Sequence, residues 1–202
     1  MPTYLRDLRS THARCREVEE NQLELFLQEP VVARLGWPED VIRQMLWEHG
    51  ETEHFIPDYG NLRLEQVSWT CEPVPREVLQ RVPTGPLDHG AIEDYAKSPV
   101  YWAEKRGEDV ADSWTRRGTW LVPPLLISTA LLNPGSHRWQ LIEGRTRVGI
   151  LRGRIQQELF VIDHHDTWVG RPRVPLTSDW PCAIESHDKP RPPSPGGQEQ
   201  IR

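Results

Sequence analysis

The fold of this chain is decided by the stretch Leu141-Ile142-Glu143-Gly144-Arg145-Thr146-Arg147-Val148-Gly149-Ile150-Leu151. Residues 139–142 form a short, mostly apolar run that is typical of a strand, and the run stops at Gly144. After that glycine, Val148, Leu151 and Ile155 recur at helical spacing. The stretch therefore predicts a strand that bends at a glycine into a helix.

The first turn of such a helix leaves backbone amides without partners at the positive end of the helix dipole. Gly144 lets the backbone bend and approach a ligand closely, and Arg145 and Arg147 add cations beside these amides. The pattern predicts a phosphate seat formed by Gly144, Arg145, Thr146 and Arg147. An amphipathic helix with an arginine-rich, solvated face would produce the same spacing and stays open as an alternative.

The distribution of charge supports an anionic ligand more than the total charge does. The whole chain has a formal net charge of −6. Between Pro134 and Gln157, however, one acid (Glu143) stands among five arginines, Arg138, Arg145, Arg147, Arg152 and Arg154, which is a local charge of +4. A basic patch in an acidic protein indicates a defined anionic ligand rather than general nucleic-acid binding, which is more typical of a basic domain.

At these residues the chain resembles the ParB/sulfiredoxin superfamily. Residues 142–148 resemble its strand–turn–helix signature of apolar residues, an acid, a glycine, two polar residues, an arginine and an apolar helix. The run from Trp120 to Ile127, with its Pro-Pro pair, is similar to the preceding strand of that signature. The resemblance covers roughly Thr119 to Val169.

The resemblance implies a nucleotide ligand, ATP, CTP or ADP with Mg²⁺. It also implies that Gly144 and Arg147 hold phosphate and that Glu143 acts near the metal or the transferred group, so that Glu143 and Arg147 are the candidate catalytic residues for phosphoryl transfer or nucleotide hydrolysis. Arg145 stands where sulfiredoxins place their nucleophilic cysteine, which argues against sulfinic-acid reduction. No helix-turn-helix pattern follows Gly153, unlike in the chromosome-partition members.

Length and composition predict a cytoplasmic globular protein. A chain of 202 residues suffices for one domain with extensions. No apolar run approaches the roughly 18–20 residues of a membrane span, and the N-terminus lacks the apolar core of a secretory signal. Cys15, Cys71 and Cys182 are far apart and form no C-x-x-C pair, which argues against a disulfide framework and a zinc site.

The remaining pattern predicts an α+β protein in three parts, with a small mixed sheet. Residues 1–118 read as a mostly helical region, with helices near 3–28, 38–49, 75–82, 88–96 and 99–117 and one strand near 62–69. Residues 119–170 form the ParB/sulfiredoxin-like core, with strands at 120–127, 138–142, 159–162 and 167–170 and a helix at 145–153 that Gly153 closes. Residues 171–202 are a proline-rich, disordered tail.

Two histidine clusters could also carry chemistry. His164 and His165, between Asp163 and Asp166, could bind a metal or supply a base, but neighbouring residues on a strand point to opposite faces. We therefore give Arg138, His164 and His165 accessory roles and assign no metal site; a polar turn between two strands is the favoured explanation of the histidine pair. The sequence around Glu48 and His49 reads as a solvated helix end.

Three functions remain open at this point. The first is a nucleotide or phosphate site at Gly144–Arg147, with or without catalysis. The second is a protein-interaction module on the same fold, which exposed tryptophans such as Trp139 and Trp168 would favour. The third is a nucleic-acid binder or nuclease, which the net charge of −6 disfavours. The sequence leaves open the nucleotide, the reaction, the pathway and the oligomeric state.

Overall fold

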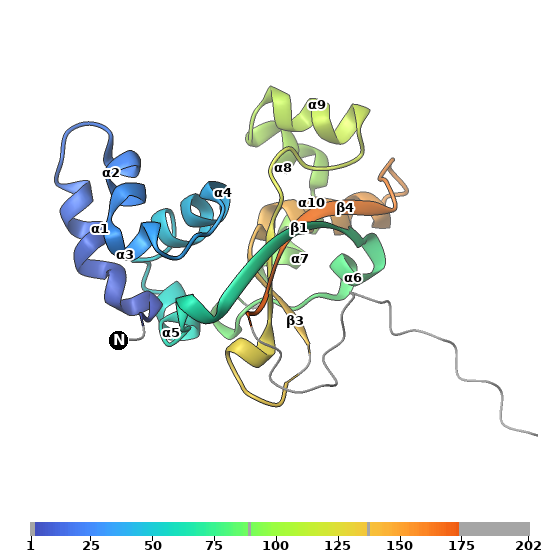
Figure 1. Cartoon of the computed structure of the whole chain (residues 1–202). Coiled ribbons are helices and arrows are strands. Elements are labelled where there is room, and N and C mark those ends of the chain that lie inside the picture. The colour runs from blue at the N-terminus through green and yellow to red at the C-terminus, as the bar shows by residue number, and fades with distance from the viewer. Residues whose placement is uncertain (1–2, 89, 137, 174–202) are drawn as a thin grey trace, which may run out of the picture.

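The computed structural model describes residues 3–173 apart from 89 and 137, and it has an α+β architecture (Figure 1). The strands are β1 (Val67–Pro75), β2 (Leu125–Ser128), β3 (Trp139–Glu143) and β4 (His164–Pro172). Before β1 lie η1 (Leu5–Leu8), α1 (Arg9–Arg16), α2 (Gln22–Gln28), α3 (Pro30–Ala33), α4 (Glu39–Val41), the π-helix η2 (Ile42–Trp47), α5 (Phe55–Tyr59) and η3 (Leu64–Gln66). After it come α6 (Arg76–Arg81), η4 (Pro86–Asp88), α7 (Ala91–Ala96), α8 (Pro99–Lys105), α9 (Glu108–Arg116), η5 (Thr129–Leu131) and α10 (Arg145–Gln156).

Within the described residues the strands form one mixed sheet in the order β1-β4-β2-β3. β1 pairs antiparallel with β4 along the whole of both strands, from Val67 opposite Pro172 to Pro75 opposite His164. β2 runs parallel to β4 and antiparallel to β3. The predicted α+β class with a small mixed sheet is therefore confirmed.

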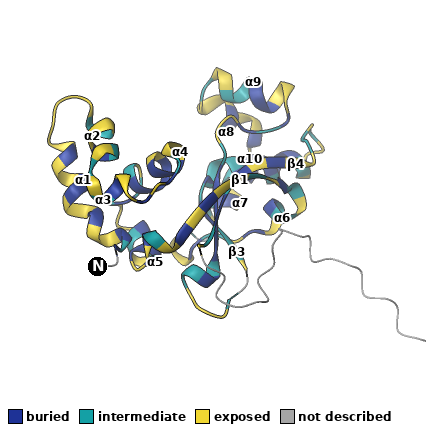
Figure 2. Ribbon diagram, in the orientation of Figure 1, coloured by how far each residue is buried: buried dark blue, intermediate teal, exposed yellow. Residues whose placement is uncertain are grey.

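Alternate residues of the central strands face two separate cores. Leu125 and Ile127 of β2 pack with the N-terminal helices, whereas Leu126 packs with α6 to α10 on the other face. Ile142 and Leu141 of β3 divide in the same way. Because successive side chains of a strand point to opposite faces, these short apolar strands are buried on both sides. In Figure 2 the residues of β3 have the colours of buried and intermediate residues.

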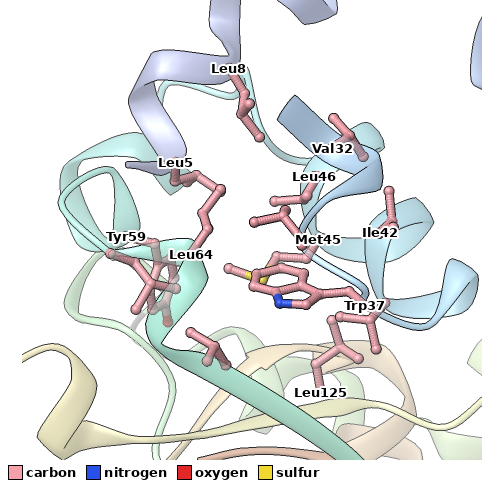
Figure 3. Close-up of a cluster of buried hydrophobic side chains, with 14 of the residues drawn as sticks. Leu5, Leu8, Val32, Trp37, Ile42, Met45, Leu46, Tyr59, Leu64 and Leu125 are labelled. Atoms are coloured by element: carbon pink, nitrogen blue, oxygen red, sulfur yellow. The ribbon is translucent and has the colours of Figure 1, made fainter. Parts of the chain in front are cut away.

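The first core joins the N-terminal helices to the sheet. Its side chains come from η1, α3, η2, α5 and η3 and reach Leu125 of β2, and the members labelled in Figure 3 are Leu5, Leu8, Val32, Trp37, Ile42, Met45, Leu46, Tyr59, Leu64 and Leu125. The predicted helical region before residue 118 therefore packs directly on the sheet. It also supplies β1, so the boundary that we expected at 118/119 falls between strands of one sheet.

Several predicted elements have different bounds. The strand expected near 62–69 is β1, which starts only at Val67 because residues 64–66 form a 3-10 turn. The helix expected over 3–28 is interrupted at Asn21, whose φ is 55°. The helix expected over 99–117 is divided into α8 and α9 at Gly107. The φ of this glycine is 128°, which is incompatible with an α-helix.

Two predictions after the central helix are wrong. Gly153 does not close α10; instead it lets this helix approach α7, since a Cβ there would overlap the carbonyl oxygen of Ala96. The apolar run at 159–162 is not a strand, and Phe160 is 55% exposed. The chain turns sharply at Glu158, whose φ is 55°, and the guanidinium of Arg154 donates to the carbonyl of Phe160.

No helix in the described part of the chain is long and apolar enough to span a bilayer. The proline-rich segment beyond residue 173, together with Cys182, lies outside the described residues, whereas residues 171–172 belong to β4.

Candidate functional site

The bend between β3 and α10 has the geometry that the sequence predicts. Gly144 precedes the helix with φ 103° and ψ 23°, a region that favours glycine, and its carbonyl accepts the first helical hydrogen bond from the amide of Val148 at 2.9 Å. A Cβ at Gly144 would overlap the ring of Pro124, which lies just before β2. A glycine is therefore required both for the backbone conformation and for the close packing.

Three amides at the start of α10 are free to bind a ligand. Within the described residues, no carbonyl or side chain accepts a hydrogen bond from the amides of Arg145, Thr146 or Arg147. These groups carry the partial positive charge of a 12-residue helix. Thr146 and Arg147 line a pocket, so their amides can receive an anion.

A pocket of about 430 Å³ lies in front of this bend. Its size falls in the range of roughly 300–1,000 Å³ that is common for small-molecule sites. Three parts of the chain supply part of its wall: Asp40, Arg43, Gln44 and Glu48 around η2, Arg106 after α8 with Asp109 at the start of α9, and Glu143, Gly144, Thr146 and Arg147 at the bend. The N-terminal region and the predicted core therefore share the site.

The apolar part of the wall comes from α9, from the segment before β2 and from α10. It consists of Val110, Trp114, Trp120, Leu121, Val122 and Ile150. Trp114 and Trp120 pack edge to face with ring centroids 5.9 Å apart. This wall gives the pocket an apolar surface beside the free amides.

Glu143 and Arg147, the candidate catalytic pair, form an ion pair with each other across the bend. Arg147 also donates from Nη1 to the carbonyls of Val122, at 2.9 Å, and Pro123, at 3.3 Å. The second oxygen of Glu143 lies 3.5 Å from Nε2 of His49. Burial opposes ionisation of Glu143, but the charge of Arg147 and the contact with His49 outweigh it and lower the pKa of this carboxyl. The pair therefore fixes the turn, and Glu143 is a weak base.

Arg145 is also committed to a partner. Its guanidinium forms an ion pair with Asp88 of η4, and Arg145 does not line the pocket, although its amide belongs to the free helix end. Both arginines that the sequence points to are thus neutralised by carboxylates. The structure brings together the backbone of the predicted phosphate seat and the side chains of Thr146 and Arg147. The charges of Arg145 and Arg147, however, are each balanced by a carboxylate.

Arg106, which the sequence analysis did not single out, is the cation with free charge at this site. It follows α8, and its Nη2 donates to Oγ1 of Thr146 at 2.8 Å. No carboxylate in the described part of the chain lies within ion-pair distance of it. Gly107 indicates the break between α8 and α9 next to Arg106. Arg106 and Thr146 are 40 residues apart, however, so the sequence does not indicate their contact.

The three accessory residues do not meet at the pocket. Arg138 is exposed and precedes β3, at the opposite end of that strand from Glu143. His164 is exposed at the start of β4, whereas its neighbour His165 is fully buried, as alternation on a strand requires.

His165 supports the apolar wall from behind. Its Nδ1 lies 2.8 Å from Oγ1 of Thr119, and its ring is 4.7 Å from that of Trp120. Burial lowers the pKa of His165 to about 4, so the ring is neutral near pH 7. Its position favours a structural role.

The other arginines of the basic patch serve the packing of α10. Arg152 donates to the carbonyls of Leu79 and Val82 and pairs with Glu93. Arg154 is 7% exposed and lies under Trp114. The local charge of +4 is therefore neither an open basic surface nor the solvated helix face that the sequence left as an alternative.

Within the described residues, no group of three or more His, Cys, Asp or Glu side chains has the arrangement of a metal site. A family-model scan, a search of curated proteins and a search of solved structures find no match for this chain. The resemblance to the ParB/sulfiredoxin superfamily stays a prediction from residues 142–148.

Proposed function

We propose that this protein binds the phosphate group of a small molecule in the pocket before α10. The observation that carries the proposal is the coincidence of free helix amides and a ligand-sized pocket at one bend of the chain. Amides at the start of a helix bind phosphate well because they point at the ligand and the helix dipole favours negative charge. Arg106 supplies the positive side chain.

A nucleotide fits this site best among phosphorylated ligands. The wall formed by Trp120, Leu121 and Val122 gives a base an apolar surface next to the phosphate seat. The superfamily resemblance implies the same class of ligand, namely ATP, CTP or ADP with Mg²⁺. A nucleotide-binding role is also favoured over an interaction module. Exposed tryptophans would support such a module, but Trp139 and Trp168 are half-buried.

The site supports binding more strongly than catalysis. Arg147 is occupied by Glu143 and two carbonyls, and the lowered pKa of Glu143 makes it a poor proton acceptor. Hydrolysis or phosphoryl transfer would require this ion pair to open. Such opening would be visible as turnover of ATP or CTP by the wild-type protein.

Calorimetric titration with ATP, CTP and ADP, each with and without Mg²⁺, tests the proposal. We expect the Arg106→Gln protein to bind roughly 10- to 100-fold more weakly, because a charge-assisted hydrogen bond contributes about 1.5–3 kcal/mol. Arg116→Gln is the matched control, since Arg116 lies on α9 in an exposed ion pair with Asp112 and does not line the pocket. No heat of binding with any of these ligands, or equal affinity for the Arg106 variant, would contradict the proposal.

A further inference from the structure

We infer that the ligand carries a hydroxyl or amino group which donates a hydrogen bond to Gln44, a residue of η2 that lines the pocket beside the phosphate seat. This inference rests on the proposed phosphate site and specifies its ligand: a phosphate ester that bears a hydrogen-bond donor. The observation that points to it is a buried amide oxygen, on a residue that lines the pocket, which has no partner among the described residues.

Gln44 lines the pocket, and a hydrogen bond holds its side-chain amide in place. The residue is 4% exposed, and its Nε2 donates to the carbonyl of Pro123 at 3.2 Å. The same carbonyl accepts from Nη1 of Arg147 at 3.3 Å. The side-chain amide of Gln44 therefore lies beside the Arg147 guanidinium, and hence near the first turn of α10.

The other end of this amide lacks a partner. Within the described residues no donor reaches Oε1 of Gln44. An unpaired buried acceptor destabilises a protein by about 1–3 kcal/mol, so such groups are rare unless a ligand or an ordered water pairs with them. Nε2 of Gln44 already donates to a carbonyl, so the unpaired atom is the oxygen, which accepts hydrogen bonds. Its partner in the ligand must therefore be a donor and not a second anionic group.

The backbone that carries Gln44 is also unusual. Residues 42–47 form a π-helix, a geometry that is rare and is concentrated at functional sites. The segment presents Arg43, Gln44 and Glu48 to the pocket. Arg43 is paired with Glu39, so it adds no free cation to this wall.

The charges around Gln44 agree with a donor-bearing ligand. Asp40 and Glu48 line the same wall, are exposed, and have no cation within ion-pair distance among the described residues. A carboxylate accepts hydrogen bonds and repels anions. Arg106 and the amides of α10 therefore offer donors to an anion, with Asp109 lining the pocket near Arg106, and η2 offers acceptors.

Two phosphate esters of equal chain length test the inference on the full chain. Glycerol 3-phosphate carries two hydroxyl groups, and n-propyl phosphate carries none. We expect the wild-type protein to bind glycerol 3-phosphate about fivefold more tightly in calorimetric titration, which is the effect of one hydrogen bond to a neutral acceptor. Equal binding of the two esters would overturn the inference and leave the phosphate seat standing, with water as the partner of Gln44.

A variant assigns the preference to this side chain. Gln44→Met keeps the length of the side chain and removes the acceptor, so we expect the variant to bind the two esters equally. The control Gln156→Met lies at the exposed end of α10 and should keep the wild-type preference. A Gln44→Met protein that still prefers glycerol 3-phosphate overturns the inference. Failure of the wild type to bind either ester overturns the inference, whereas the titration with ATP, CTP and ADP decides the phosphate site separately. The wild-type ratio remains decisive if the variant unfolds.

Discussion

Arg106 and Thr146 are joined by a hydrogen bond of 2.8 Å between Nη2 and Oγ1, although 40 residues separate them in the chain. The contact holds the guanidinium over the first turn of α10, where the free amides lie. A long arginine side chain loses much rotational freedom when it is ordered, so a preformed contact of this kind reduces the free-energy cost of binding an anion.

Loss of this contact should weaken phosphate binding without removing it. We expect Thr146→Val, which keeps the shape of the side chain, to lower nucleotide affinity about threefold to tenfold, the effect of one positioning hydrogen bond. Thr115→Val on the exposed face of α9 is the control, since its hydroxyl bonds only within that helix. Titration calorimetry measures both. A Thr146→Val protein with wild-type affinity would show that Arg106 needs no positioning.

The Glu143–Arg147 pair should stabilise the fold in a pH-dependent way. The side chains are 14% and 20% exposed, so Glu143→Gln leaves a mostly buried guanidinium without its counter-charge. We expect a loss of roughly 2–4 kcal/mol in the free energy of unfolding, measured by urea denaturation at pH 7. Glu39→Gln removes an exposed pair with Arg43 and should change the stability little.

The sign of this pH dependence follows from the lowered pKa of Glu143. The unfolded chain takes up a proton near the ordinary pKa of 4.5, and the folded chain does so only at lower pH. The stabilisation is therefore present above pH 4.5 and is lost as the pH falls through the folded pKa. The Glu143→Gln protein should lack this part of the acid dependence, and an unchanged acid profile would contradict the assignment.

Gly144 should be intolerant of a side chain for two separable reasons. Gly144→Ala places a Cβ at φ 103° and against Pro124, so we expect a loss of about 2–4 kcal/mol in thermal or urea unfolding. Gly135→Ala has a similar φ of 91° but meets no atom within 4 Å. It should lose only the backbone part, about 1–2 kcal/mol. Equal losses at the two positions would argue against the close approach to Pro124.

His165 should make the fold sensitive to mild acid. Its pKa is about 4 in the folded protein, against an ordinary value of 6.5, so the unfolded chain binds the proton first as the pH falls. Stability is therefore full above pH 6.5 and declines between 6.5 and about 4, by on the order of 3 kcal/mol. Urea unfolding across this range should show a flatter profile for His165→Asn than for the exposed control His164→Asn.

The sequence predicted the strand–turn–helix at residues 139–156 because local signals agree there. The apolar run, the glycine and the helical spacing all point to one bend, and the structure has it. The run at 159–162 misled the prediction since apolar content alone does not distinguish a strand from a loop that packs on a helix. The division of α8 from α9 was readable at Gly107, a strong helix breaker.

Contacts between residues that are distant in the chain could not be predicted from the sequence. Nothing local pairs β1 with β4, and the register from Val67 opposite Pro172 follows only from the folded sheet. The same holds for Arg106, which reaches Thr146 from another helix. It holds too for Asp88 and Glu143, which neutralise the two arginines that looked like free cations in the sequence.

The antiparallel pairing of β1 with β4 has a practical consequence for dissecting the molecule. A fragment that starts at residue 119 would keep β2, β3 and β4 but would expose the backbone groups of a nine-residue strand along one side. Such a bare edge recruits strands from other chains. Fragments that begin at this point, whether made by proteolysis or by recombinant expression, should therefore aggregate and would not be suitable for measuring ligand affinity.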